Sequence, residues 1–252
     1  GANSLSGAAG NDTLDGGTGI DTMTGGDGSD FYYVRDSGDI VSETNATTST
    51  GGNDTVYSTL AAYTLTANVE NGRILSTTAA NLSGNSGNNV LYAGAGNNIL
   101  NGGTGTDTDT VSYAYGLAGT TGVTVNLAAS TAQATGGSGS DTLLSIENLI
   151  GSAYADRLTG NTGNNALTGG LGKDVLTGSG GSDTFDFNAL SEMGLTSTTW
   201  DVITDFAHGT DKIDLATLDA DTALAGDQAF TAPVLGGTFS GVFASPGDQY
   251  FD

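Results

Sequence analysis

Residues 16–33 read GGTGIDTMTGGDGSDFYY, and this stretch contains one nine-residue pattern twice. Each copy has the form Gly-Gly-x-Gly-x-Asp, followed by three residues of which the middle one is large and apolar. Alternation along a β-strand directs that middle side chain to one face, and glycine reaches the positive φ angles of a tight turn. One copy therefore predicts a short strand and a turn, and two copies predict one complete coil of a solenoid.

The nine-residue pattern recurs in three blocks, at about residues 5–33, 84–111 and 136–186. Its eighth position is apolar in every undisturbed copy, at Leu14, Met23, Tyr32, Leu91, Leu100, Leu143, Leu158, Leu167, Leu176 and Phe185. Coils stacked about 4.8 Å apart bury these side chains between two rows of parallel strands, and several repeats are needed to bury enough surface. The pattern predicts an all-β protein, a parallel β-roll or β-solenoid.

One copy of the pattern is disturbed. The stretch GGTGTDTDTVSY from Gly102 contains an additional Thr-Asp pair, which places Asp109 where the apolar residue belongs. Val111 restores the apolar position two places later. The sequence therefore leaves open whether Asp107 or Asp109 takes the acidic place of the pattern.

The composition excludes several classes of protein. The 252 residues carry 28 acids against five bases, a formal net charge of −23, so the chain is expected to repel nucleic acid and anionic lipid. The absence of cysteine excludes disulfides and thiolate metal sites. The sequence has no apolar run long enough to cross a bilayer and no signal peptide. It opens within the repeat pattern, which indicates part of a longer protein.

The aspartates of the pattern pose an electrostatic problem. Alternate copies lie on the same edge of the predicted stack, which places Asp12 one coil from Asp30, and Asp156 one coil from Asp174. Two carboxylates about 5 Å apart repel by roughly 3 kcal/mol at an effective dielectric constant of about 20. A divalent cation between the turns converts this repulsion into a net attraction, and glycine carbonyls supply further oxygen ligands. Such an oxygen-only ligand set is typical of calcium, whereas zinc prefers His or Cys.

These repeats resemble the calcium-binding β-roll of RTX (repeats-in-toxin) proteins, also called hemolysin-type repeats. The resemblance covers most of residues 5–186. It implies a parallel β-roll, several Ca²⁺ ions in the turns, and export from a Gram-negative-type bacterium by type I secretion. The implied protein is secreted and extracellular, with calcium and the type I secretion apparatus as partners.

The candidate calcium ligands are the acids and the glycine carbonyls of the pattern. The aspartates are Asp12, Asp21, Asp30, Asp107 or Asp109, Asp141, Asp156, Asp174 and Asp183. The glycines are Gly16, Gly19, Gly25, Gly28, Gly169, Gly172 and Gly178. Asn89, Asn98 and Asn165 take the acidic position in three copies, where an amide oxygen can ligate but contributes no charge. We therefore expect weak or vacant sites in the second block and good sites in the third.

Two spacers leave the pattern, at residues 34–83 and 112–135. They still alternate like strands, which predicts irregular coils that continue the same solenoid in a domain spanning residues 1–186. The element Val69-Glu70-Asn71 has a counterpart at 146–148, where Glu147 is the acid. Glu70 and Glu147 are candidates for additional ligands or for stabilising a turn, and the turn is the favoured interpretation.

Residues 187–252 are predicted to form a truncated C-terminal flanking or capping segment. The stretch 200–215 resembles the segment that follows the roll in serralysin-type RTX proteins. The apolar residues expected to cover the open end of the stack, which otherwise exposes strand edges, are Trp200, Ile203, Phe206, Ile213 and Leu215. The acids that either complete the last calcium sites or remain solvated are Asp201, Asp205, Asp211 and Asp214.

No enzyme is expected within this chain, because His208 is its only histidine and it has no HExxH zinc motif, G-x-S-x-G elbow or P-loop. We expect a calcium-binding module that is disordered in a calcium-poor cytoplasm and folds on extracellular calcium. One alternative is a structural surface-layer or adhesin segment, in which calcium also mediates self-assembly or cell-surface contact. Another is the non-catalytic tail of a secreted protease or lipase.

Overall fold

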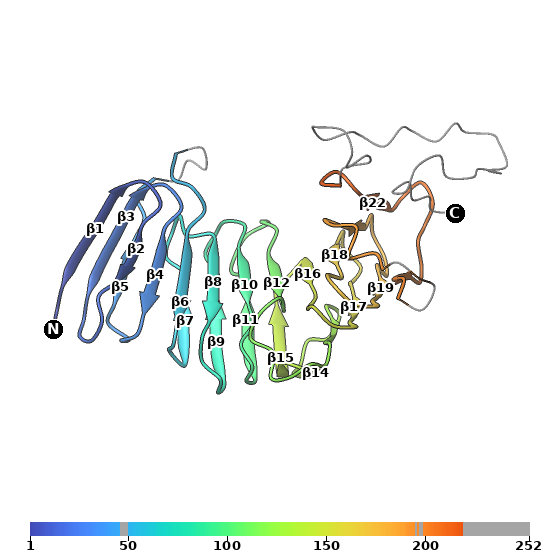
Figure 1. Cartoon of the computed structure of the whole chain (residues 1–252), viewed down its shortest axis with the longest axis horizontal. Coiled ribbons are helices and arrows are strands. Elements are labelled where there is room, and N and C mark those ends of the chain that lie inside the picture. Colours follow the sequence, from blue (N-terminus) through green and yellow to red (C-terminus); the bar gives the residue numbers. More distant parts are fainter. Residues whose placement is uncertain (46–49, 195, 197–198, 219–252) are drawn as a thin grey trace.

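The computed structural model describes residues 1–45, 50–194, 196 and 199–218, and these residues contain 22 strands and no helix. Figure 1 shows the strands side by side along the long axis, from β1 (Ser4–Ala9) to β22 (Lys212–Asp214). The described part of the chain accordingly offers no helix that could cross a membrane. Successive coils stack in two rows of strands, so the predicted all-β, parallel β-roll is confirmed.

One row of strands is a continuous sheet of ten parallel strands, which we call the long sheet. Its strands, in spatial order, are β2 (Thr13–Asp15), β4 (Phe31–Val34), β6 (Thr55–Ser58), β8 (Asn71–Ile74), β10 (Val90–Tyr92), β12 (Thr110–Ser112), β16 (Asn148–Ile150), β18 (Ala166–Thr168), β20 (Thr184–Asp186) and β22.

The opposite row is divided into three smaller sheets. The first contains β1, β3 (Thr22–Asp27) and β5 (Ile40–Ser42). The second contains, in spatial order, β14 (Gln133–Gly136), β15 (Gly139–Leu144), β11 (Asn98–Asn101), β9 (Ala80–Ser83) and β7 (Ala62–Thr64). The third contains β13 (Thr124–Asn126), β17 (Arg157–Thr159), β19 (Val175–Thr177) and β21 (Val202–Ile203).

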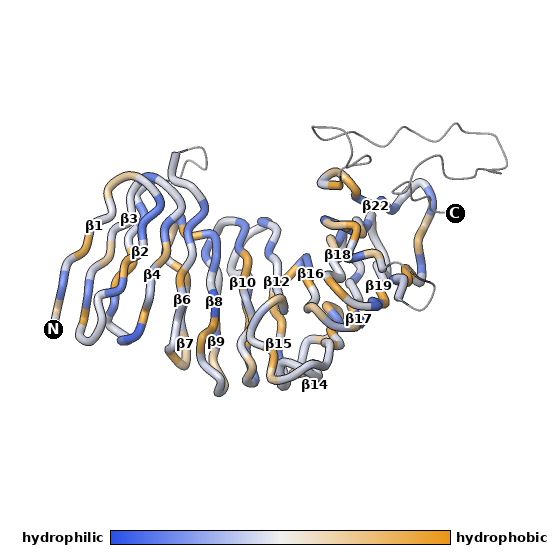
Figure 2. Tube along the Cα trace, in the orientation of Figure 1, coloured by the Kyte–Doolittle hydropathy of each residue, from blue (hydrophilic) through white to orange (hydrophobic). Residues whose placement is uncertain are grey.

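The apolar positions of the repeat form the core between the two rows. Leu14 lies opposite Tyr32 in the next strand, and Leu167 lies opposite Phe185, so one coil takes 18 residues in both blocks. All the apolar residues predicted for the eighth position are at most 5% exposed. Figure 2 shows hydrophobic stretches recurring from coil to coil. Because full burial of one such side chain contributes about 1.5–3 kcal/mol, the stack gains stability coil by coil.

The first spacer continues the stack without the nine-residue pattern. Its strands β6 and β8 extend the long sheet, and β7 and β9 extend the opposite row. Gly72 occupies a core position in β8, between Val56 and Leu91 of the adjacent strands. A Cβ at Gly72 would lie 2.9 Å from Leu82 and 3.0 Å from Leu65. These two leucines fill the space that Gly72 leaves, so the core remains packed.

The second spacer departs from the expected parallel arrangement. The sequence predicts a repeat turn of the solenoid at Gly136, but the structure places an antiparallel hairpin of β14 and β15 there. Gly136 and Gly139 lie in this hairpin turn, with φ angles of 79° and 84°. The physical reason is that residues 133–136 form a strand themselves, so the following glycines reverse the chain sharply instead of starting a new coil.

This hairpin makes the two rows unequal. β15 stacks on β11, but β17 pairs with β13 rather than with β15. An antiparallel bridge between Val123 and Gly136 links the start of β13 to β14. The row of smaller sheets therefore holds two additional strands where the long sheet passes directly from β16 to β18. Figure 1 shows the strands after β16 at a different angle from those before it, as unequal rows require.

The last described coil pairs β21 with β19 and β22 with β20. Ile203, Ile213 and Leu215 pack against the core as expected. Phe206 is 41% exposed, but its ring lies 6.2 Å from the ring of the buried Phe185, so it covers part of the end of the stack as predicted. Trp200 is 53% exposed and does not pack over the core as predicted. The short strand β21 turns only Ile203 inward, and Trp200 precedes that strand. Residues 219–252 of the predicted flanking segment lie outside the described residues.

We expect Leu167→Ala to lower the free energy of unfolding by about 2–5 kcal/mol, because Leu167 is fully buried between Leu149 and Phe185. Leu171→Ala is the matched control, because Leu171 lies in the next turn and is 46% exposed. Its effect should stay within about 0.5 kcal/mol. Urea denaturation in calcium-saturated buffer measures both values, and equal effects would contradict the described core.

Candidate metal centre

Two sets of acidic and amide side chains run along the turns of the roll. The long ladder directly precedes the strands of the long sheet and consists of Asp12, Asp30, Asp54, Glu70, Asn89, Asp109, Glu147, Asn165, Asp183 and Asp211. The short ladder follows the opposite edge and consists of Asp21, Asp39, Asn98, Asp141, Asp156, Asp174 and Asp201. In the repeat this position is the end of the turn, so successive coils bring these side chains together.

At most steps of each ladder, the backbone N–H of one rung donates to the side chain of the next. The Asp12 N–H donates to Asp30 Oδ1 (2.7 Å). The Asp156 N–H donates to Asp174 Oδ1 (2.8 Å), and the Asp174 N–H donates to Asp201 Oδ1 (2.7 Å). These bonds hold one oxygen of each carboxylate against the neighbouring coil. Both stacked pairs predicted from the repeat are therefore confirmed.

The second carboxylate oxygen of several rungs has no partner. The buried Oδ2 atoms without a hydrogen bond are those of Asp12, Asp21, Asp30, Asp174 and Asp201. The described residues form two ion pairs, Arg35–Asp15 and Lys212–Asp214, and neither includes a ladder residue. A buried carboxylate without a partner is strongly destabilising, so these rungs require a proton or a cation.

Burial raises the pKa of several carboxyls of the two ladders. Desolvation, aided by the charges of neighbouring acids, raises the pKa of Asp174 to about 8 and that of Asp54 to about 7. The same cause raises the pKa of Asp201 to about 6. A divalent cation acts in the opposite direction, because it favours the charged carboxylate. The ladder is thus a set of groups that a bound cation would stabilise in the ionised form.

The glycines of the repeat give the turns the space that a cation site needs. A Cβ at Gly169 would collide with the carboxylate of Asp174 in the same turn. Gly170 and Gly172 have φ angles of 88° and 142°, and a Cβ at Gly170 would collide with the Ser152 carbonyl oxygen of the neighbouring coil. Backbone therefore packs against backbone, which brings carboxylate and carbonyl oxygens together, and hard oxygens are the ligands that calcium prefers.

The other predicted glycines have the same two roles. Gly16, Gly25 and Gly178 leave space for the aspartates of their own turns, at Asp21, Asp30 and Asp183. Gly19 and Gly28 share the positive φ of Gly172, at 114° and 116°. The first glycine of the repeat thus makes room for the acid, and the later ones allow close approach of two turns.

At the asparagine rungs, the side-chain amide links two neighbouring coils by a hydrogen bond. The Asn89 Nδ2 donates to the Val69 carbonyl (3.0 Å), one coil earlier. The Asn98 Nδ2 donates to the Ala80 carbonyl (3.1 Å) in the same way. The Asn165 Nδ2 donates to the carbonyl of Glu147 (2.7 Å). The amide N–H therefore binds a carbonyl of the neighbouring turn, a bond that an ionised carboxylate at an acidic rung cannot make.

The structure decides which aspartate of the disturbed copy joins the ladder. Asp109 is 6% exposed and its Oδ1 accepts from the Asn89 N–H (2.8 Å). Asp107 is exposed and lies off the ladder. The additional residues bulge outward, and Val111 returns to the core. Asp109 therefore occupies the acidic place of the pattern.

Two rungs of the third block already have protein donors. Asp141 accepts from the Asn98 N–H (2.8 Å) through Oδ1 and from the Thr135 hydroxyl (3.3 Å) through Oδ2. Asp156 accepts from both the N–H and the hydroxyl of Ser152. These carboxylates have less need of a cation than the unpartnered rungs. The third block is therefore less uniform than its sequence indicates.

The C-terminal acids have different roles. Asp211 ends the long ladder, where its Oδ1 accepts from the Asp183 N–H (3.0 Å). Asp205 lies above the turn at Gly178 and accepts from the Gly178 N–H (2.9 Å) and the Ser179 N–H (2.8 Å). Asp214 forms an ion pair with Lys212 and is not a rung of either ladder. Hydrogen bonding to Lys212 lowers the pKa of Asp214.

The two glutamates of the spacers are rungs of the long ladder. Glu70 Oε2 accepts from the Asp54 N–H (2.8 Å), and Glu147 Oε2 accepts from the Asp109 N–H (2.9 Å). Each glutamate thus makes the bond that an aspartate makes elsewhere in the ladder. They stabilise the turn, as favoured from the sequence, and they also place a carboxylate at a rung.

Sequence reasoning missed two rungs, Asp39 and Asp54, which belong to turns without the glycine pattern. Asp39 Oδ1 accepts from the Asp21 N–H (3.1 Å), and Asp54 Oδ1 accepts from the Asp30 N–H (2.7 Å). The sequence still contains a weaker signal for these two rungs. Each acid is followed two places later by an apolar residue that is buried in the core. An acid at that spacing from a core residue is the part of the motif that the ladder requires.

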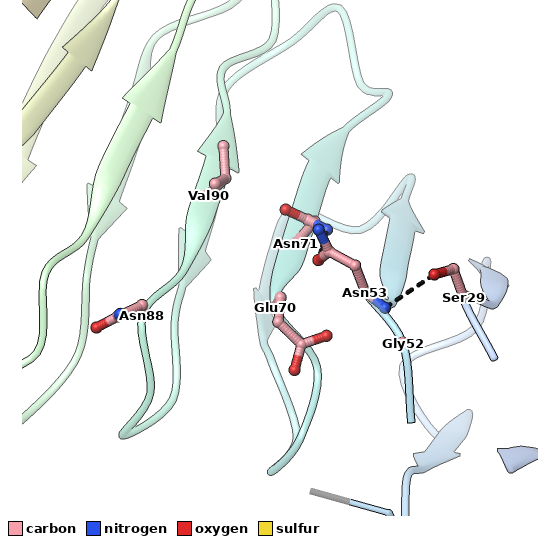
Figure 3. Close-up of a pocket in the computed structure, with 7 residues that line it drawn as sticks. All are labelled: Ser29, Gly52, Asn53, Glu70, Asn71, Asn88 and Val90. Atoms are coloured by element: carbon pink, nitrogen blue, oxygen red, sulfur yellow. Dashed lines mark hydrogen bonds between the residues drawn. The ribbon is translucent and has the colours of Figure 1, made fainter. Parts of the chain in front are cut away.

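An open groove borders the long ladder. It is lined by Ser29, Gly52, Asn53, Glu70, Asn71, Asn88 and Val90. Figure 3 shows Glu70 among the amides, with the Asn53 N–H donating to Ser29 Oγ (2.9 Å). The Asn71 Nδ2 donates to Asn53 Oδ1 (2.7 Å). One carboxylate and several amides line this groove, which forms a polar edge of the long ladder.

Stacked carboxylates in glycine turns define a calcium-binding parallel β-roll. Residues 1–41 and 78–109 match the family described as RTX calcium-binding nonapeptide repeat (4 copies). Residues 106–234 match the family described as Peptidase M10 serralysin C terminal, slightly more than half of the chain. The chain therefore belongs to the serralysin C-terminal family and carries RTX repeats, which bind Ca²⁺. No curated protein matches the chain.

These matches agree with the recognition made from the repeats. Both describe non-catalytic regions, the repeats and the C-terminal part of serralysin-like proteins. Proteins of these families are secreted, so the chain is a calcium-binding module of an extracellular RTX protein. The donor set fits the ion, because buried oxygens without partners and closely packed backbone lie where the repeats place them.

We expect Asp174→Asn to reduce the number of calcium ions bound by the folded chain by about one, because the variant removes a charged ligand. Asn165→Asp is the reciprocal variant, because it removes the amide donor to Glu147 and places a carboxylate next to Asp183. It should add about one ion. Equilibrium dialysis counts the bound calcium, and unchanged counts in both variants would contradict the assignment of acid and amide rungs.

Proposed function

We propose that this chain is a calcium-dependent folding module, unfolded in a calcium-poor cytoplasm and folded after type I export. The observation that carries the proposal is the set of buried ladder oxygens without a partner. Like charges one coil apart oppose the stacking that the apolar core favours. Calcium removes this opposition, so its concentration decides whether the roll folds.

Each proposed calcium site lies between two successive acidic rungs of one ladder. In most of these pairs at least one carboxylate oxygen has no hydrogen-bond partner. The pairs are Asp12 with Asp30, Asp21 with Asp39, Asp174 with Asp201, and Asp183 with Asp211, each completed by carbonyls of the intervening turns. Each independent site adds about 1.4 kcal/mol at a tenfold excess of calcium over its dissociation constant. Several sites together approach the stability of a typical domain, about 5–15 kcal/mol.

A more specific role is supported by the serralysin match. Residues 106–234 match the C-terminal part of an M10 peptidase family, and the chain has a single histidine and no HExxH motif. These facts favour the tail of a secreted protease, with the peptidase domain elsewhere in the protein. In this role the roll stabilises its parent outside the cell. A structural surface-layer or adhesin segment remains the competing role, and a catalytic motif in the parent protein would decide against it.

We expect the chain to be largely unfolded in EGTA and to gain β-sheet signal cooperatively when calcium is added. Magnesium should not replace calcium, because it demands a small octahedral site and retains its waters. Far-ultraviolet circular dichroism of the whole chain measures the transition. A β spectrum that is identical in EGTA and in calcium would contradict the proposed function.

A further inference from the structure

Three carboxylates meet between the second and third coils. Asp30, Glu43 and Asp54 each place one oxygen within 4.8 Å of the other two, and this is the one such group of three among the residues that the structure describes. Their exposed fractions are 0%, 7% and 1%. Asp30 and Asp54 are successive rungs of the long ladder, but Glu43 does not belong to either ladder.

Glu43 stands where the repeat has a glycine. It follows β5 by one residue, and Gly25 occupies the same place one coil earlier, next to the paired residues Thr24 and Ser42. A Cβ at Gly25 would collide with Asp30 Oδ2, the Tyr32 hydroxyl and Glu43 Oε1. Three oxygens from three segments therefore converge beside a glycine, in space that any other residue would fill.

One oxygen of this group has no hydrogen-bond partner. Asp30 Oδ2 is buried and unpaired, whereas Asp30 Oδ1 accepts from the Asp12 N–H (2.7 Å). Glu43 accepts from the Tyr32 hydroxyl through Oε1 and from the Gly26 N–H through Oε2 (3.4 Å). Neither ion pair of the described residues includes a member of the group. The unpaired, fully buried oxygen is therefore directed at a place that suits a cation.

Asp205 provides an internal comparison at the other end of the roll. It too replaces a glycine of the repeat, two positions beyond the pairing of Leu176 with Ile203. Both of its oxygens accept backbone hydrogen bonds, from Gly178 and Ser179. The turn of the preceding coil thus provides a hydrogen-bond donor for each carboxylate oxygen of Asp205. Glu43, at the equivalent place, instead lies beside Asp30 and Asp54 and adds a third carboxylate to a pair in which Asp30 Oδ2 has no hydrogen-bond partner.

We propose that Asp30, Glu43 and Asp54 form a three-carboxylate calcium site that fills before the two-carboxylate sites of the repeats. The inference rests on the proposed function and goes beyond the repeat motif, because Glu43 is not a motif residue. Calcium affinity rises with the number of charged ligands. The site joins the regular first block to the first spacer, so calcium at low concentration would fix this junction first.

The test is a calcium titration of the whole chain, followed by a parallel titration with Tb³⁺, which accepts similar oxygen ligands. Tyrosine excitation reports terbium bound here, because the Tyr32 hydroxyl contacts Glu43. Glu43→Gly restores the residue type of the repeat, and Glu43→Gln keeps the shape without the charge. We expect both variants to weaken the first binding phase about tenfold or more and to leave the later phases unchanged.

The matched control is Asp183→Asn, which removes one buried carboxylate from another part of the long ladder. It should leave the first phase intact and weaken a later one. If the chain folds on calcium but Glu43→Gly and Glu43→Gln retain the first phase, this inference is overturned while the proposed function stands. If calcium fails to fold the wild-type chain, the proposed function itself is wrong.

Discussion

The structure depends on the approach of carboxylates from successive coils. Most acidic rungs accept a backbone hydrogen bond from the neighbouring coil, as Asp174 does from Asp156, and this bond fixes the stacking distance. It also leaves the second oxygen of several rungs buried and unpaired. The apolar core favours this stack through burial, and the charges oppose it. A cation in the turns lets both requirements be met.

The rungs divide into two kinds that differ by one atom. An asparagine donates its amide N–H to a carbonyl of the neighbouring turn, as Asn165 does to Glu147, and so holds two coils together without metal. An aspartate at the same place has no proton to donate. A roll that mixes both kinds keeps some metal-independent contacts, and under the proposed function its acidic segments respond to calcium. The ratio of the two kinds thus tunes how much of the fold depends on the ion.

The sequence predicted the roll, the coil length and the buried apolar positions, because strand alternation and turn chemistry repeat in register. It did not predict the β14–β15 hairpin, since Gly136 and Gly139 suit a hairpin turn as well as a repeat turn. It missed Asp39 and Asp54 because their turns lack the complete Gly-Gly-x-Gly-x-Asp pattern, although their spacing to the core is that of the motif. It missed Glu43 because a carboxylate at a glycine position becomes significant only when the neighbouring coil is known.

The most direct test of this account is a crystal structure of the chain grown in calcium, with an anomalous difference map measured at a wavelength where calcium scatters anomalously. Peaks are expected between stacked acid rungs, such as Asp174 and Asp201, and no peak is expected where Asn89 or Asn165 binds a carbonyl. Empty acidic turns, or equal peaks at the asparagine rungs, would contradict the claim that cations between carboxylates hold the coils together.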